Sequence, residues 1–235
     1  MDKIKELVKR ECSGWKLWQV VWMIVANLVI IGVSVYQGDS LLSIVAAVTG
    51  VICVILCGLG KVSNYFFGTI NVVLYAIVAY NAKYYGDVML NILYYFPTNI
   101  LGWILWAKNV DKENKTVYKK RMTLIQDIIL LIISVISVFV YSYILRLLGG
   151  NLPLVDSMST VFSIIAQILM IKRFAEQWII WIVVDVVSVI MWFVALFNEG
   201  ASIAMLLMWS IYLGNAVIMF IKWMKETKVE STREV

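Results

Sequence analysis

Amide and phenol side chains recur at helical spacing within residues 64–106, a stretch that is otherwise largely apolar. The first set steps by seven and then four residues, through Asn64, Asn71 and Tyr75. The second set steps by three or four residues and comprises Asp87, Asn91, Tyr94, Thr98 and Gly102. Such intervals place each set on one face of a helix. Two helices therefore present polar groups to a common partner, which predicts a polar, aromatic-lined cavity for a small molecule inside a membrane.

The apolar run at about 178–197 carries one acid among tryptophans. Trp178, Trp181, Asp185 and Ser188 step by three, four and three residues and share one helical face. An ionised carboxylate near the middle of a bilayer costs about 2.5–3.5 kcal/mol, which favours a place for Asp185 on a polar cavity. Trp181 lies one turn deeper than Trp178 and is the better candidate to stack on a ligand ring. Two alternatives stay open: Asp185 as a structural acid that bonds a neighbouring helix, and Trp178 as part of the aromatic belt at the membrane boundary.

Two further apolar segments supply polar candidates. Gln167 lies four residues after Ser163, and Tyr212 and Asn215 lie three apart, with Trp209 beside them. An amide within hydrocarbon requires a hydrogen-bonding partner, which a cavity or a bound molecule can supply. The predicted substrate-binding set is therefore Trp178, Trp181, Asp185, Ser188, Gln167, Asn64, Asn71, Tyr75, Asn91, Tyr94, Trp209, Tyr212 and Asn215.

The composition defines the class of protein. Of the 235 residues, 62% are hydrophobic and only 15% are charged. So few charges cannot cover so much apolar surface in water, which indicates an integral membrane protein. The chain has no histidine and three cysteines, of which Cys53 and Cys57 are interpreted as small buried apolar residues. The sequence contains no metal-ligand cluster and no glycine-rich phosphate loop, so we expect no metal, no cofactor and no enzymatic activity.

Eight apolar runs are long enough for helices that cross a bilayer about 30 Å thick. Their continuous apolar character argues against barrel strands and predicts an all-α membrane protein with helices at about 20–36, 41–59, 64–82, 87–107, 124–145, 155–171, 178–197 and 201–223. Every Lys and Arg except Lys83 and Arg146 falls on one side of this predicted membrane, so both termini are expected to be cytoplasmic. Because the basic residues are spread over loops and termini, the net charge of +5 predicts contacts with anionic membrane lipid and no nucleic acid.

An internal repeat is predicted at an offset of 114 residues. It aligns Asn71 with Asp185 and Lys108 with Lys222, and it carries helices 2 to 4 onto helices 6 to 8. Because the offset passes an even number of helices, the repeats are parallel, and parallel repeats of transporters enclose the substrate site between them. The expected organisation is a cytoplasmic N-terminus with an additional helix 1 (1–40), a first three-helix repeat (41–107), a basic cytoplasmic loop with linker helix 5 and an outer loop (108–153), a second three-helix repeat (154–223) and a cytoplasmic tail (224–235).

Two signatures, YYGD followed by GWxxW in the first repeat and WxxWxxxD in the second, resemble the PnuC family of bacterial vitamin transporters, best known for nicotinamide riboside. The resemblance covers about residues 41–223 and implies a SWEET-like fold and a homotrimer in the bacterial plasma membrane. It also implies facilitated diffusion, with the substrate trapped by a cytoplasmic kinase that phosphorylates it. By this resemblance, Trp178 and Trp181 would stack on the nicotinamide, and the ribose and carboxamide would be contacted by Asn64, Asn71, Asn91 and Asn215.

Other functions remain open at this point. Similar relatives carry thiamine or riboflavin, and a wider cavity or a second midplane acid beside Asp185 would favour thiamine. A membrane enzyme that acts on a lipid or prenyl substrate is less well supported, because it would place clustered acids or histidines at a cytoplasmic helix end. A purely structural membrane protein is disfavoured by the many amides near the midplane.

Overall fold

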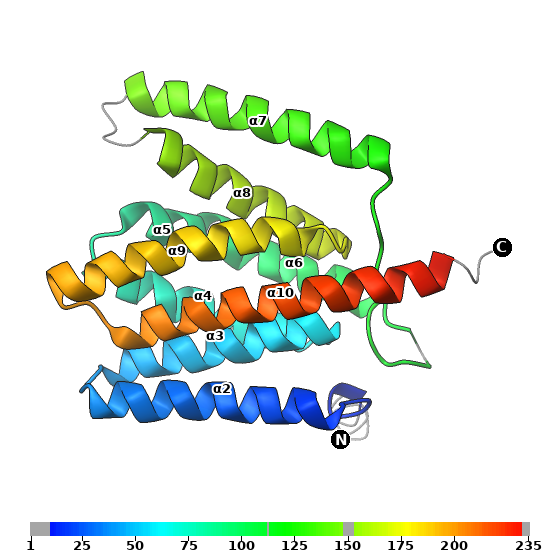
Figure 1. The fold of residues 1–235 in the computed structure, drawn as a ribbon, viewed down its shortest axis with the longest axis horizontal. Helices are drawn as coiled ribbons and strands as arrows, with labels where there is room; N and C mark the ends of the chain where they lie inside the picture. Colours follow the sequence, from blue (N-terminus) through cyan, green and yellow to red (C-terminus); the bar gives the residue numbers. More distant parts are fainter. Residues whose placement is uncertain (1–9, 112, 148–152, 232–235) are drawn as a thin grey trace.

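The computed structural model describes residues 10–111, 113–147 and 153–231, which form an all-helical bundle (Figure 1). The first seven predicted runs coincide with helical structure to within a few residues at each end, and the fourth is divided among three elements. The eighth, predicted at 201–223, continues as a helix to Ser231. The predicted terminal segments 1–9 and 232–235 and the predicted outer-loop residues 148–152 lie outside the described residues. The helices are α2 (Leu17–Tyr36), α3 (Leu41–Leu59), α4 (Asn64–Asn81), α5 (Tyr85–Met89), the π-helix η1 (Leu90–Tyr95), α6 (Phe96–Ala107), α7 (Leu124–Leu147), α8 (Pro153–Lys172), α9 (Gln177–Glu199) and α10 (Ile203–Ser231).

Apolarity alone identifies six membrane-crossing helices in the described part of the chain: α2, α3, the continuous helix Tyr85–Ala107, α7, α9 and α10. The helix α8 contributes a shorter apolar segment, Ser157–Lys172, and α4 does not reach the same apolarity. Both carry polar residues, among them Asn71 and Tyr75 on α4 and Gln167 on α8, and these face the cavity described below. The two helices are less apolar because part of their surface faces polar groups inside the bundle instead of lipid.

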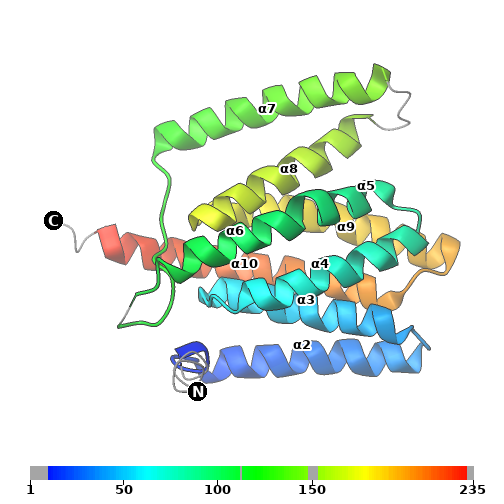
Figure 2. The ribbon, with the colours of Figure 1, turned by 180° about the vertical axis from the view of Figure 1, so that it is seen from behind.

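Within the described residues, six helices contact one another in a closed order: α3, α4, α6, α8, α9, α10 and back to α3 (Figures 1 and 2). In each predicted repeat the middle helix, α4 or α9, contacts both of its neighbours in sequence. We call the contacts between α6 and α8 and between α10 and α3 the two seams, because they join one predicted repeat to the other. Helices α2 and α7 pack outside this ring at opposite edges. Two three-helix units related by a two-fold axis would give the same order, but the internal repeat itself stays a prediction.

The start of α2, the segment 108–123 and the C-terminal half of α10 meet at one end of the bundle (Figure 1). The segment 108–123 crosses this end and ties it together: the Val117 N–H donates to the Gly60 carbonyl at 3.0 Å. Lys120 also exchanges backbone hydrogen bonds of 2.8 and 2.9 Å with Arg173 and Ala175, in the turn between α8 and α9. We call this end the basic end, since it carries Lys16, Lys61, Lys119, Lys120, Arg173 and Lys222.

Candidate binding cavity

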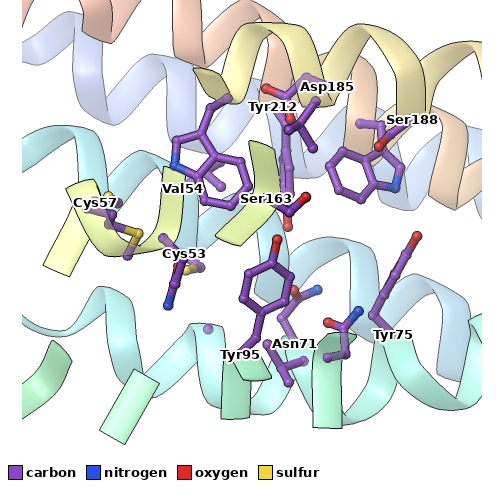
Figure 3. A pocket seen from close by; sticks show the side chains of 18 of the residues that line it. Cys53, Val54, Cys57, Asn71, Tyr75, Tyr95, Ser163, Asp185, Ser188 and Tyr212 are labelled. Carbon is purple, nitrogen blue, oxygen red and sulfur yellow. The ribbon is translucent and has the colours of Figure 1, made fainter. Parts of the chain in front are cut away.

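A cavity lies inside the ring of six helices, with about 990 Å³ of space free of protein atoms, part of it open to solvent. Figure 3 shows Asp185 and Tyr212 on one side of this space and Tyr75, Asn71 and Tyr95 on the other. Side chains that are far apart in the sequence therefore meet at one place. The predicted site residues that line the cavity are Trp178, Trp181, Asp185, Ser188, Gln167, Asn71, Tyr75, Asn91, Trp209 and Tyr212.

Three predicted site residues do not line the cavity, and two of them, Tyr94 and Asn215, join helices around it. The Asn64 amide donates to the Lys61 carbonyl at 2.6 Å, at the first turn of α4. The Tyr94 hydroxyl donates to the carbonyl of Ile164 on α8 at 2.9 Å, and the Asn215 amide donates to the carbonyl of Val54 on α3 at 3.0 Å. These side chains needed partners within hydrocarbon, as expected, and in this structure the partners are backbone carbonyl groups.

The π-helix η1 changes which residues of the fourth run face the cavity. Spacing of an α-helix predicted the face Asp87, Asn91, Tyr94 and Thr98, but the cavity is lined by Asp87, Asn91, Tyr95 and Asn99. The predicted face is therefore wrong beyond Asn91. In η1 the Phe96 N–H bonds to the Asn91 carbonyl, five residues back, and the extra residue in the turn rotates the following face by one position.

Pro97 is the feature of the sequence that could have indicated this irregularity. It follows η1 directly, and its ring nitrogen has no hydrogen with which to continue the regular helical bonding. Spacing alone could not show whether the helix would kink, break or widen at this proline. The consequence for the site is that Tyr95 and Asn99, which were not predicted as site residues, line the cavity.

Trp181 lines the cavity and is partly buried, and Tyr95 lies near it. The centroids of these two rings are 6.3 Å apart and their planes are inclined by 44°. Trp178 is only 3% exposed. Its ring packs edge to face against that of Trp223, with the two ring centroids 5.8 Å apart. Burial of Trp178 inside the bundle argues against a lipid-facing aromatic belt. Trp181 has the ring face that is more available to a ligand.

Asp185 is 2% exposed and lines one side of the cavity (Figure 3). Among the described residues its carboxylate forms no ion pair and no side-chain hydrogen bond to a neighbouring helix, which was the alternative interpretation. A carboxyl group in such surroundings is costly unless it finds a hydrogen-bond donor or a positive charge. The cavity therefore offers a ligand an acceptor group that the protein leaves free.

A second acid reaches the same cavity through a hydrogen-bonded chain. The Trp192 indole N–H donates to the Tyr75 hydroxyl at 3.0 Å, and this hydroxyl donates to the Asp87 carboxylate at 2.8 Å. Asp87 belonged to the polar face predicted from spacing but not to the predicted binding set. The chain fixes the orientation of Tyr75 and Asp87, so one acid of the cavity is held in place and the other, Asp185, is free.

Gly50 on α3 allows two lining side chains to lie against the helix backbone. A methyl group at this position would overlap the Tyr212 hydroxyl and would stand 2.6 Å from the Asn71 amide nitrogen. That amide donates to the carbonyl of Ala46 at 2.8 Å. Because Gly50 has no side chain, Tyr212 and Asn71 can lie at the cavity wall instead of inside the cavity.

Comparison with known proteins gives consistent matches over most of the chain. The family model described as nicotinamide mononucleotide transporter matches residues 40–225. The nicotinamide riboside transporter PnuC of Neisseria mucosa is 42% identical, over 95% of this chain and 87% of that protein. The protein of the same name from Haemophilus influenzae is 31% identical, over 92% of this chain and 93% of that protein. These relatives are named as transporters and not as enzymes.

A solved structure is also similar to this chain. The crystal structure of the vitamin B3 transporter PnuC superposes with a TM-score of 0.86 at 41% sequence identity. The superposition covers 95% of this chain and 97% of the crystallised one. The all-helical membrane fold therefore agrees with an experimentally determined fold over nearly its whole length.

Proposed function

The chain belongs to the nicotinamide mononucleotide transporter family, and from this premise we propose that it takes up nicotinamide riboside across the bacterial plasma membrane. The observation that carries the proposal is the cavity inside the helix ring, where Trp181 and Tyr95 offer ring faces and Asp185 offers a free carboxylate. Nicotinamide riboside is a flat pyridinium ring with a positive charge, joined to a ribose. The cavity supplies one kind of contact for each of these features.

In the binding mode that we propose, the pyridinium ring stacks on Trp181 and Asp185 neutralises its charge. The amides of Asn71 and Asn91 and the hydroxyl of Tyr212 then address the ribose and the carboxamide. Gln167 is already engaged, since its amide donates to the Asn99 side-chain oxygen at 3.0 Å. Gln167 thus connects α8 to α6 across the seam between them. Its remaining hydrogen-bonding groups are proposed to contact the substrate.

We infer that transport proceeds by rocking of one repeat against the other around this cavity. At the basic end, each seam is held by an indole hydrogen bond. The Trp106 N–H donates to the Met170 carbonyl at 3.0 Å, between α6 and α8. The Trp223 N–H donates to the Gly58 carbonyl at 2.8 Å, between α10 and α3. Both indoles are fully buried, so an opening of the cavity towards the basic end has to break these two bonds.

Trp223→Phe should weaken the closed contact between α10 and α3, because it removes the indole hydrogen bond but largely keeps the volume of the ring. Loss of one hydrogen bond of about 0.5–1.5 kcal/mol would raise the population open at the basic end roughly two- to tenfold. Cys57 is 3% exposed, lines the cavity and is one residue from Gly58, so its thiol reports the opening. We expect faster labelling of Cys57 by a membrane-impermeant maleimide, measured in a Cys12→Ser/Cys53→Ser background because Cys12 is exposed and Cys53 also lines the cavity.

The matched control for this measurement is Trp103→Phe. Trp103 lies on α6 and is 41% exposed, and its indole forms no hydrogen bond across a seam in the described residues. The control should label at the wild-type rate. An unchanged rate for Trp223→Phe as well would show that the indole bonds do not hold the basic end closed.

We propose facilitated diffusion, with trapping by a cytoplasmic kinase that phosphorylates the substrate. An uncoupled carrier can only equalise the free substrate on the two sides. In proteoliposomes at zero membrane potential, internal nicotinamide riboside should therefore rise to the external concentration and stop, and should exceed it only when a nicotinamide riboside kinase and ATP are enclosed. Accumulation above the external level without a kinase, driven by an imposed proton or Na⁺ gradient, would contradict facilitated diffusion.

We propose that the basic end faces the cytoplasm, which places both termini there, because basic residues concentrate on that side of a membrane. Apolar side chains of α7 such as Ile132 and Phe139 are more than half exposed and are proposed to contact membrane lipid. The resemblance to the family further suggests a homotrimer.

A second candidate substrate is thiamine or another ring-bearing vitamin. The observation that favours it is the presence of two acids, Asp87 and Asp185, on one cavity, since a thiazolium ring also carries a positive charge. The Asp87 carboxylate is already bonded by Tyr75, which leaves one free acid for one cationic ring. Direct titration with each vitamin distinguishes the two substrates.

A further inference from the structure

A second cavity lies at the basic end, separate from the central one. Its lining comes from the start of α2, the turn after α3, the segment 108–123 and the C-terminal half of α10. Five of the residues that line it are lysines and two are acids: Lys16, Lys61, Lys119, Lys222, Lys225, Asp111 and Glu226. Positive charge therefore exceeds negative charge within one concave surface.

One of these lysines holds the cavity in shape. The Lys61 ammonium is almost fully buried and donates to the carbonyls of Ser13, Arg10 and Lys115 at 2.7, 3.2 and 3.2 Å. Burial lowers the pKa of Lys61, and the nearby Glu11 carboxylate counteracts this. All three hydrogens of the ammonium group are used. Lys61 thus joins the N-terminal segment to the segment 108–123 and has no hydrogen left for a ligand.

The other lysines of this cavity outnumber the carboxylates that could neutralise their charge. Glu226 pairs with Lys119 through one oxygen and with Lys222 through the other, the second at 3.6 Å. Lys119 and Lys16 both repel Lys222 electrostatically. Like charges in a partly desolvated cavity repel more strongly than in water. An anion with several acceptor oxygens would relieve this repulsion.

The two acids do not remove the excess charge. Asp111 accepts hydrogen bonds from the Glu113 N–H and the Asn114 amide, both at 2.8 Å, and these bonds lower the pKa of Asp111. Asp111 is therefore ionised, but its carboxylate oxygens already accept hydrogen bonds within its own loop. Lys16 and Lys225 are exposed and form no ion pair within the described residues. Their ammonium groups are available at the mouth of the cavity.

We expect the mouth of this cavity to lie at the depth of lipid headgroups. Leu17 and Trp18, at the start of α2 beside Lys16, are 81% and 42% exposed. A tryptophan at a helix end marks the boundary between hydrocarbon and water. We propose that this cavity binds a phosphate group, supplied by the headgroup of an anionic phospholipid. A phosphate group offers several acceptor oxygens to lysines from two different segments, and a neighbouring lysine-rich surface attracts anionic lipid.

The test is the thermal stability of the purified protein in a neutral detergent, read without transport substrate and therefore independent of the proposed function. Added phosphatidylglycerol should raise Tm with increasing concentration, since a ligand that binds the folded state stabilises it, and phosphatidylcholine should not. In the variant Lys16→Gln/Lys225→Gln at least half of this rise should be lost. The control Lys108→Gln/Lys172→Gln removes two exposed lysines outside the cavity and should keep the full rise.

A parallel titration with glycerol 3-phosphate distinguishes the source of the phosphate. A rise in Tm with this soluble phosphate but not with phosphatidylglycerol, lost in Lys16→Gln/Lys225→Gln, would overturn the lipid as the occupant of the site. An equal rise with phosphatidylglycerol in the wild type, the cavity variant and the control would overturn the site altogether, because the effect would then be a general response to negative charge.

Discussion

Trp181→Ala is expected to weaken binding of nicotinamide riboside about ten- to a hundredfold and to abolish uptake at low substrate concentration. Stacking of a base on an aromatic side chain contributes about 1–3 kcal/mol when it is measured by alanine substitution, and 1.4 kcal/mol corresponds to a factor of ten in Kd. Trp181 lines the cavity and is partly buried, whereas Trp178 is buried against Trp223 and Trp209 packs against Tyr75 and Tyr212. Isothermal titration calorimetry on the purified variant measures the loss.

Two controls separate stacking from general damage. Trp181→Phe keeps a ring face and should retain most of the affinity. Trp18→Ala removes an exposed tryptophan from α2, outside the cavity, and should bind as the wild type does. If Trp181→Ala bound with unchanged Kd, the ring of the substrate would have to be held elsewhere in the cavity.

Gly50→Ala is expected to weaken binding more than tenfold while the bundle still folds. The new methyl group would overlap the Tyr212 hydroxyl and crowd the Asn71 amide. Both are the ends of side chains that can move, so the strain is relieved by rotation of Tyr212 and Asn71 into the space that the substrate needs. We expect Kd for nicotinamide riboside to rise more than tenfold, with a helical circular dichroism spectrum like that of the wild type.

Gly32→Ala is the matched control, because Gly32 is also helical and a methyl group there meets no atom within 4 Å. It should leave affinity unchanged, and in general alanine stabilises a helix relative to glycine. Adding Tyr212→Phe to Gly50→Ala removes the hydroxyl that the methyl group would overlap, and should restore part of the binding. Wild-type affinity in Gly50→Ala would show that neither Tyr212 nor Asn71 shapes the substrate site.

The positions of the helices could be predicted from the sequence because long apolar runs have few alternatives in a membrane. Where the helix is regular, spacing also predicted the face: Asn71 and Tyr75 on α4, and Asp185 and Ser188 on α9, all line the cavity. In such helices the periodicity of polar residues is the direct result of which side faces lipid.

Other features could not be predicted because they depend on contacts distant in the sequence. Spacing of an α-helix failed at η1, where Tyr95 replaced Tyr94 at the cavity. An isolated amide such as Asn215 signals that a partner exists, but the partner turned out to be the Val54 carbonyl on another helix. The burial of Trp178 depends on Trp223, which is brought beside it only by the folding of α9 against α10.

The central claim is that the cavity around Trp181 binds nicotinamide riboside. The most direct test is titration of the purified wild-type protein with nicotinamide riboside, thiamine and riboflavin in turn, followed by tryptophan fluorescence. Saturable quenching by nicotinamide riboside alone, lost in Trp181→Ala, is the predicted result. Saturable quenching by thiamine or riboflavin, with no response to nicotinamide riboside, would contradict the claim and assign the cavity to another vitamin.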